Sequence, residues 1–259
     1  MRGRSIVLML AAMALTACAT MIPPPPGSVI PAFLAAAVGD PSRPAADRER
    51  DADRRPAETL AFAGVTPGMK VGELVPGGGY FTRILAKAVG PTGHVYAYVP
   101  DELTKMAKRD PAVKAVADDP AYGNISMIIR RLPAFSTPEK LDLVWTSQNY
   151  HDMHAKFMGP VDVAAMNKAI FRTLKPGGTY IVLDHADDVG RGVQDVDSLH
   201  RIDPTVVRQE VEAAGFIFEG ESNILRNPAD THKLPVFDPS VRGHTDQFIY
   251  KFRKPRGAH

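Results

Sequence analysis

The sequence predicts an α/β protein with a doubly wound, mainly parallel sheet of seven strands and an antiparallel hairpin at its C-terminal end. Three observations support this prediction. Short apolar runs alternate with segments in which apolar residues recur every three or four positions, as in helices that cover a sheet. A glycine cluster follows the first apolar run. The last two runs have no helical segment between them, so we expect them to pair antiparallel at one edge.

The expected strands and helices follow one another in a regular order. The predicted strands are residues 70–74, 94–99, 125–129, 141–146, 179–184, 216–225 and 247–252. The predicted helices are 81–88, 102–109, 163–174 and 204–214. We expect Asp203 to cap the last helix, with Pro204 in its first turn and Gly215 at its end.

The composition is that of an ordinary folded domain. Of the 259 residues, 44% are hydrophobic, 23% charged and 7% aromatic, which excludes a chain disordered throughout, a membrane bundle and a coiled coil. Lys and Arg number 31 against 29 Asp and Glu; without Arg2 and Arg4, which we expect to be removed, both counts are 29. Because a chain without basic excess neutralises few phosphates, we expect no nucleic-acid partner.

The N-terminal residues resemble a bacterial lipoprotein signal peptide, residues 1–17. Arg2 and Arg4 precede an apolar stretch that is too short to span a membrane, and small residues lead to Cys18. The resemblance implies acylation of Cys18 and a lipid-anchored protein of the cell envelope that faces the periplasm. Ala19 favours the outer membrane over the inner one. An uncleaved anchor is the alternative.

Residues 18–46 contain a proline run and no apolar period, so we expect a stiff tether followed by a folded domain over 47–259. Cys18 is the only cysteine, which excludes an intramolecular disulfide. Its place in the signal segment also argues against thiol catalysis.

The order of elements resembles that of class I methyltransferases, which use S-adenosylmethionine and have a Rossmann-like fold. The resemblance covers roughly residues 54–254, including the glycine turn at 73–80 and Leu-Lys-Pro-Gly-Gly at 174–178. Segments similar to a group of bacterial predicted methyltransferases are 149–152, 184–185, 199–203 and 245–248. The resemblance implies S-adenosylmethionine as cofactor and methyl transfer to a small-molecule acceptor.

The glycine turn is the expected cofactor site. Glycines after a strand let a ligand approach the backbone, and the N–H groups of the following helix favour an anionic group. The resemblance implies that Glu73 binds the amino group of the cofactor. The other expected cofactor contacts are Gly77, Gly78, Gly79, Tyr80 and Asn149. A merely structural turn is the alternative.

Two residues depart from the family pattern. Val75 stands in place of the first glycine, and its β-branched side chain limits both the backbone dihedrals and the clearance. Val99 stands where the family has an acidic residue that binds the ribose hydroxyls. Unless Asp101 or Glu102 replaces it, the lost hydrogen bonds weaken binding by about tenfold to a hundredfold.

Polar residues after the fourth and fifth strands are the catalytic candidates, because ligands of open α/β sheets bind beyond the carboxyl ends of the strands. We expect His151 to remove a proton from the acceptor, with Asp152 or Asp184 fixing its tautomer and His185 nearby. The alternative is that these side chains only satisfy loop backbone groups.

A bound metal ion is a further alternative. His151, His154, Asp184, His185 and His200 are of the right chemical kind. Their spacing is not specific for a metal, so we expect none.

Two segments are candidates for covering the site. Residues 43–55 form either a solvated charged face or a flap in which Arg48, Asp51 or Arg54 closes the cofactor pocket. Residues 226–244 are too long for a tight hairpin and form either a substrate lid or a surface insertion.

The sequence therefore leaves three hypotheses. The first is an S-adenosylmethionine-dependent methyltransferase. The second is a methyltransferase-like ligand-binding or scaffold lipoprotein without activity, because the cofactor is made in the cytoplasm and a lipoprotein faces away from it. The third is a metal-assisted hydrolase on the same sheet.

Overall fold

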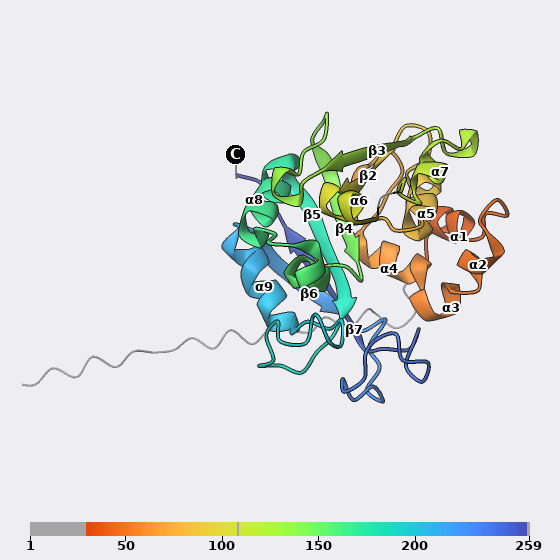
Figure 1. Cartoon of the computed structure of the whole chain (residues 1–259). Coiled ribbons are helices and arrows are strands. Elements are labelled where there is room, and N and C mark those ends of the chain that lie inside the picture. Colours follow the sequence, from red (N-terminus) through yellow and green to blue (C-terminus); the bar gives the residue numbers. More distant parts are fainter. Residues whose placement is uncertain (1–29, 108, 258–259) are drawn as a thin grey trace, which may run out of the picture.

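The computed structural model describes residues 30–107 and 109–257, and in this part of the chain a mixed sheet lies between two layers of helices (Figure 1). The predicted signal peptide and Cys18 lie outside the described residues. None of the described helices has both the length and the apolar character needed to cross a membrane.

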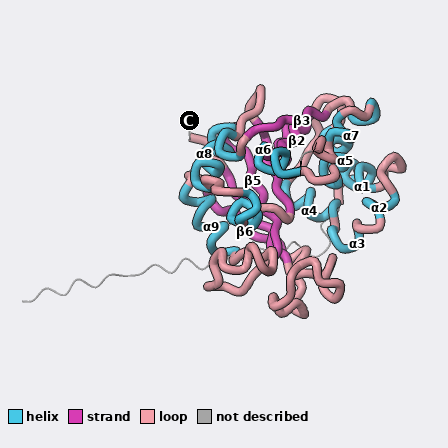
Figure 2. Tube along the Cα trace, viewed as in Figure 1, coloured by secondary structure: helices cyan, strands magenta, loops and turns pink. Residues whose placement is uncertain are grey.

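Seven strands form the sheet in the order β3, β2, β1, β4, β5, β7, β6 (Figure 2). They are β1 (Lys70–Leu74), β2 (His94–Pro100), β3 (Ile125–Arg130), β4 (Leu141–Ser147), β5 (Leu174–His185), β6 (Ile217–Ser222) and β7 (Gln247–Arg253). The first five are parallel, and β7 runs antiparallel to both β5 and β6. The predicted fold class is confirmed, including the hairpin at the edge.

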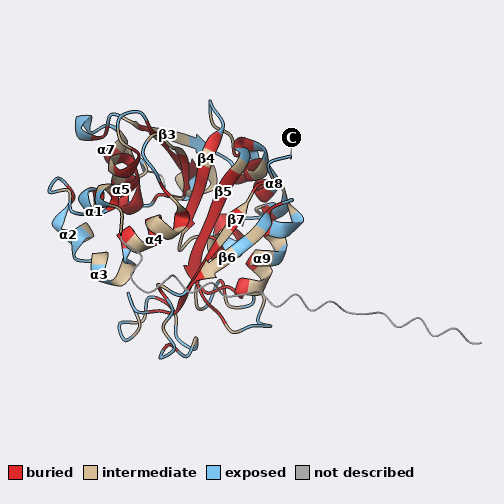
Figure 3. Cartoon of the chain, turned by 180° about the vertical axis from the view of Figure 1, so that it is seen from behind, coloured by how far each residue is buried: buried red, intermediate tan, exposed pale blue. Residues whose placement is uncertain are grey.

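Helices cover both faces of the sheet (Figure 1). They are α1 (Ala32–Val38), α2 (Ala45–Arg48), α3 (Asp51–Arg54), α4 (Pro56–Ala63), α5 (Tyr80–Val89), α6 (Asp101–Ala107), α7 (Lys114–Ala117), α8 (Val163–Thr173) and α9 (Pro204–Ala213). Short 3-10 turns are η1 (Pro120–Tyr122), η2 (Leu132–Ala134), η3 (His151–His154) and η4 (Lys156–Met158). Helices α1, α4 and α5 share one apolar cluster, and α8 and α9 share the other. Between these layers β4 and β5 are buried along most of their length (Figure 3).

Local sequence signals set several element boundaries as expected. Asp203 accepts a hydrogen bond from the backbone N–H of Thr205, and Pro204 begins α9. Gly79 precedes α5 with φ +84°, and a Cβ there would lie 2.7 Å from the Val116 side chain. Only glycine therefore fits between the end of the turn and α7.

The fifth strand is longer than predicted. It begins at Leu174 rather than at 179, and the Pro-Gly-Gly sequence lies inside it. Lys254, the residue after β7, explains the difference, because its carbonyl accepts the N–H of Gly177 and its own N–H donates to the carbonyl of Gly178. Pairing with a distant segment thus continues the ladder through a sequence that is typical of a turn.

The described part of the predicted tether, residues 30–46, is not extended. Leu34 in α1 is 0% exposed and packs in the cluster that contains α4 and α5. Arg43 is also buried and makes two hydrogen bonds with Asp51, at 2.8 and 2.7 Å. Over residues 30–46 the structure therefore differs from the predicted tether. The sequence did not indicate α1, because a helix of seven residues with two buried positions is too short to show an apolar period.

Replacing Leu34 with alanine is expected to lower the free energy of unfolding by about 2–5 kcal/mol, because a fully buried side chain leaves a cavity. Urea denaturation measures the loss. Leu234→Ala is the matched control, since Leu234 is 38% exposed and its truncation should cost about 1 kcal/mol or less. Equal stability of the Leu34 variant and the wild type would mean that α1 is not part of the core.

Candidate functional site

Two cavities adjoin the glycine turn at the carboxyl end of β1. The turn cavity, of about 160 Å³, is lined by residues of the turn, of α3 and of the segment after β4. The apolar cavity, of about 320 Å³, is lined by the same turn residues and by residues from the end of β2 to Ala112. Both include Val75 to Gly78, so they lie on either side of the turn.

The turn exposes its backbone at two of the three predicted glycines. A Cβ built on Gly77 or Gly78 would meet nothing within 4 Å, so the backbone there faces open space. Gly79 does not line either cavity, and its N–H donates to the carbonyl of Pro76. The predicted contact of Gly79 with the cofactor stays a prediction, and in the structure this glycine allows the close packing of α5 against α7.

Val75 lies between the two cavities without closing either of them. Its φ is +51°, a left-handed conformation that costs a β-branched residue about 1–3 kcal/mol. Two backbone hydrogen bonds hold it there: its N–H donates to the carbonyl of Tyr98 at 2.9 Å, and its carbonyl accepts from Asn149 Nδ2 at 3.2 Å. Asn149 thus touches the turn, and it also lines the turn cavity.

Glu73 places a carboxyl group at the wall of the turn cavity. It is buried, and Thr82 Oγ1 donates to its Oε2 at 2.6 Å. Burial raises the pKa of Glu73 to about 8, against the lowering effects of Thr82 and Arg54. Ser147 Oγ, on the same cavity, is buried without a hydrogen-bond partner among the described residues. The cavity wall therefore offers a carboxyl group and an unused hydroxyl group to a ligand.

No acidic side chain replaces the family's ribose-binding residue at the end of β2. Val99 and Pro100 line the apolar cavity, whereas Asp101 and Glu102 do not. Asp101 Oδ2 instead accepts from Lys105 Nζ at 2.9 Å. The acidic residue that does line this cavity is Asp110, at an exposed position.

The N-terminal flap covers the turn cavity with α3. Tyr80 OH donates to Asp51 Oδ1 at 2.6 Å, which connects the flap to the start of α5. The guanidinium carbon of Arg54 lies 4.6 Å from the centroid of the Tyr80 ring, and Arg54 lines the cavity. Of the predicted flap residues, Asp51 and Arg54 are in place, whereas Arg48 is exposed and donates to the carbonyl of Pro41.

His151 is held between two carboxylates in the loop after β4. Its Nδ1 donates to Asp184 Oδ1 at 2.8 Å, and its Nε2 lies 3.1 Å from Asp152 Oδ1. Burial alone would lower the pKa of His151, but the two carboxylates outweigh it and raise this pKa to about 10. The contact with Asp184 is the one that its predicted tautomer-fixing role requires. At a pKa of about 10 both nitrogens of His151 carry protons near neutral pH, so its predicted role as a base requires loss of one of them.

His185 is the neutral imidazole of the site. It follows Asp184 at the end of β5, and its Nδ1 lies 2.8 Å from Thr245 Oγ1. Burial, together with the positive charges of His151, Arg201 and Arg54, lowers the pKa of His185 to about 3 against the attraction of Asp184. His185 is therefore uncharged near neutral pH, and it, rather than His151, keeps an unprotonated ring nitrogen.

The remaining histidines of the predicted cluster have separate partners. His154 Nε2 pairs with Glu210 Oε2 at 3.1 Å, on the side of α9. His200 Nδ1 lies 3.8 Å from Asp152 Oδ1. Each of His151, Asp152 and His200 has one possible metal-ligand atom, and these three atoms lie within 4.8 Å of one another. Because carboxylates occupy both nitrogens of His151, we describe this group as an ion-pair cluster and assign no metal to it.

The segments 186–203 and 226–246 lie at the carboxyl end of β5 (Figure 1). Residues of the second segment line a third cavity together with residues of α3, of the loop after β4 and of the end of β5. We call it the arginine cavity, and its volume is about 510 Å³. It is lined by Arg50, Asp53, Arg54, Gln148, His185, Val236, Phe237, Arg242, Gly243, Thr245 and Gln247. It shares Arg50, Arg54 and Gln148 with the turn cavity, so the two cavities meet at these residues.

Sequence reasoning missed Gln148 and Arg242. Gln148 has φ +60°, accepts a hydrogen bond from Arg54 and donates through Nε2 to Gln247 Oε1 at 2.9 Å. Its position directly before Asn149, at a strand end, was the available signal. Arg242 lies in the predicted lid segment, where no sequence signal distinguishes it from the other charged residues.

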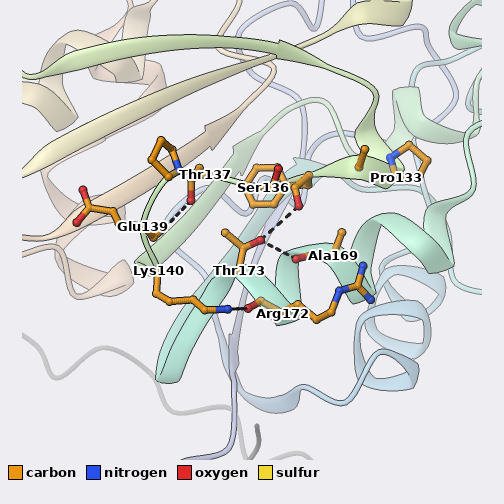
Figure 4. Close-up of a pocket in the computed structure, with 11 residues that line it drawn as sticks. Pro133, Ser136, Thr137, Glu139, Lys140, Ala169, Arg172 and Thr173 are labelled. Atoms are coloured by element: carbon orange, nitrogen blue, oxygen red, sulfur yellow. Dashed lines mark hydrogen bonds between the residues drawn. The ribbon is translucent and has the colours of Figure 1, made fainter.

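Another cavity, of about 590 Å³, lies far from these residues (Figure 4). It is formed by residues 133–140, which precede β4, and by the end of α8. Lys140 Nζ donates to the carbonyl of Arg172 at 2.6 Å, and Thr173 Oγ1 donates to the carbonyl of Ala169 at 2.9 Å (Figure 4). Because it lies at the amino end of β4, it is separate from the predicted site.

Two curated sequence relatives cover most of the chain, although no protein-family model matches it. The ubiquinone/menaquinone biosynthesis C-methyltransferase UbiE of Ectopseudomonas mendocina is 30% identical over 197 residues, which are 74% of this chain and 66% of the relative. The enzyme of the same name from Shewanella halifaxensis is 29% identical over 187 residues, which are 70% of this chain and 69% of the relative.

The fold also matches solved methyltransferase structures. An S-adenosylmethionine-dependent methyltransferase from Mesorhizobium loti superimposes with a TM-score of 0.52 at 17% identity, over 79% of this chain and 99% of that one. At such identity the likeness shows the fold. The sequence relatives support S-adenosylmethionine-dependent methyltransferase activity for this chain, and the shared fold is consistent with it.

Proposed function

We propose that this protein transfers a methyl group from S-adenosylmethionine to a small molecule bound in the arginine cavity. The observation that carries the proposal is the junction of the turn cavity and the arginine cavity at Arg50, Arg54 and Gln148. Glu73 lies on the cofactor side of this junction and His185 on the acceptor side. The names of the two relatives place them in quinone biosynthesis, which supports a small-molecule acceptor.

The residues present fit the cofactor. Glu73 and the unpartnered Ser147 hydroxyl would hold its amino-acid part in the turn cavity. The open backbone at Gly77 and Gly78 leaves room for the ligand to pass the turn. The apolar cavity would hold the adenosine part through contacts with Val99 and Leu103 rather than through a charged hydrogen bond.

The bound cofactor supplies an electrophilic methyl group on a positively charged sulfur. A lone pair of the acceptor would form the new bond to the methyl carbon while the carbon–sulfur bond breaks. The two electrons of the broken bond would stay on the sulfur, which becomes neutral. When the acceptor atom carries a proton, that proton must leave. His185 lines the acceptor side and is neutral, so it is placed to take this proton. The main contribution of the protein is alignment across the junction.

Binding of S-adenosylhomocysteine is expected to depend on the charge of Glu73. At pH 8, Glu73→Gln should weaken binding about tenfold or more, because a charge-assisted hydrogen bond is lost. Burial raises the pKa of Glu73 to about 8, so Glu73 loses its charge as the pH falls below that value. Between pH 6 and pH 8 the affinity of the wild type should therefore increase with pH, by up to about tenfold per pH unit. Isothermal titration calorimetry from pH 6 to pH 8 measures both effects.

Two controls support this experiment. Glu139→Gln changes a carboxylate by the remote cavity and should leave the affinity unchanged. Glu73→Gln should show a weaker pH dependence than the wild type, because only the contribution of the cofactor's own groups remains. No binding to the wild type at millimolar ligand would contradict the proposed function and favour a non-catalytic protein.

The opposite charge states of the two buried histidines are also measurable. In protein labelled with ¹³C and ¹⁵N at histidine, the His185 signals should stay those of a neutral ring from pH 5 upward. The His151 signals should stay those of an imidazolium up to about pH 9, since its pKa is raised to about 10. His185→Asn and His151→Asn assign the signals. If His151 instead loses its proton near pH 6.5, the raised pKa is contradicted and His151 becomes a candidate base.

We also propose that Cys18 is acylated and anchors the protein in the cell envelope, facing the periplasm. The apolar segment before Cys18 and the small residues that lead to it support this location. In cells grown with labelled palmitate, the wild-type chain should carry the label and Cys18→Ser should not. An unprocessed, unlabelled wild-type chain would overturn the anchor and leave the N-terminal segment uncleaved.

A further inference from the structure

The arginine cavity has an excess of positive charge. Arg50, Arg54 and Arg242 line it, against a single carboxylate from Asp53. Asp53 Oδ1 lies 3.7 Å from Nδ1 of His244. Within the described part of the chain, none of the three arginines forms an ion pair within 4 Å.

Other arginines around the site are paired with carboxylates. Arg43 pairs with Asp51 at 2.7 Å, Arg201 with Asp230 at 2.9 Å, and Arg226 with Asp246 at 2.8 Å. Arg50 and Arg242 are exposed, whereas Arg54 is half-buried, and burying a guanidinium without a carboxylate is costly. The cavity therefore brings together three unpaired guanidinium groups that can bind an anion.

Arg54 shows this lack of compensation most clearly. Burial, together with the positive charge of Arg50, lowers the pKa of Arg54 to about 10. Its described hydrogen bond is to Gln148, a neutral amide. An anion in the cavity would offset both the desolvation and the repulsion between the two arginines.

The rest of the cavity wall suits a carbon skeleton attached to that anion. Val236 and Phe237 contribute apolar surface, and Phe237 is 59% exposed with its ring centroid 4.8 Å from that of His200. His185, at the end of β5, and Thr245, before β7, add polar groups to the wall. A molecule with an anionic end and an apolar body therefore matches the wall.

We propose that the methyl acceptor carries a carboxylate or phosphate group, which the guanidinium of Arg242 binds in the arginine cavity together with Arg50 and Arg54. This inference rests on the proposed function and adds the chemical class of its substrate. Arg50 and Arg54 also face the turn cavity and therefore the carboxylate of the cofactor. Arg242 lines only the arginine cavity of the two, so it distinguishes the acceptor from the cofactor.

The test uses three probe molecules of similar size: 4-hydroxybenzoate, phenyl phosphate and the neutral 4-hydroxybenzamide. Their binding to the full-length protein is measured by NMR titration in the presence of S-adenosylhomocysteine. The wild type should bind one or both anions about tenfold or more tightly than the amide, and the stronger of the two anions identifies the group as carboxylate or phosphate.

Substitution of Arg242 assigns the anion preference to this cavity. Arg242→Gln should remove the preference while leaving amide binding unchanged, and Arg242→Lys should restore part of it, because lysine keeps the charge but not the two-pronged geometry. Arg256→Gln is the matched control at an exposed position near the C-terminus and should behave like the wild type.

Equal binding of anion and amide, or no binding of either anion at millimolar concentration, would overturn this inference. So would an anion preference that survives Arg242→Gln. These outcomes are separate from failure of the proposed function. S-adenosylhomocysteine binding without an anion preference would refute only the acceptor class, whereas an Arg242-dependent preference without cofactor binding would refute only the methyl transfer.

Discussion

The buried carboxylate of Asp184 is the group on which the geometry of the site depends. Its Oδ1 accepts from His151 Nδ1 and from the N–H of His185, each at 2.8 Å, and its Oδ2 accepts the N–H of His151 at 2.7 Å. One side chain at the end of β5 therefore fixes the loop after β4. Removing one partner of such a buried pair typically costs about 3–5 kcal/mol. Because Gln148 and Asn149 lie in the same loop, this contact also positions the junction between the two proposed ligand cavities.

The same contact separates the roles of two neighbouring histidines. The carboxylates of Asp184 and Asp152 raise the pKa of His151, which favours its cationic form. His185 then lies beside a cation, an adjacent carboxylate and two arginines, and burial keeps it neutral. Identical side chains at similar depth thus end with pKa values on opposite sides of the usual one, because their hydrogen-bond partners differ.

Two of the five non-glycine residues with left-handed φ in the described part of the chain lie where the turn and the β4 loop meet. Val75 and Gln148 both have left-handed φ angles, at +51° and +60°, and both line the turn cavity. Each is held by a backbone hydrogen bond from its own N–H, to Tyr98 and to Leu183 respectively. These hydrogen bonds offset the conformational cost of the two left-handed residues. Strained residues that line one cavity are typical of ligand sites. The β-branched side chain of Val75 predicted little clearance at the turn. In the structure, cavities adjoin the turn although Val75 is present.

The sequence by itself determined the class of fold, the order and approximate position of the strands, and the glycine turn. These follow from local signals, because apolar periodicity, caps and turn residues act within a few positions along the chain. It also placed Glu73, His151, Asp184 and His185 at strand ends, since the carboxyl ends of parallel strands meet at one edge. Tertiary structure decided the rest. Only spatial contacts could show that His151 lies between two carboxylates, that α1 packs on the core, and that Arg242 and Arg54 share a cavity although 188 positions separate them in the sequence. The charge state of a buried group depends on neighbours from distant segments, and no local pattern in the sequence records them.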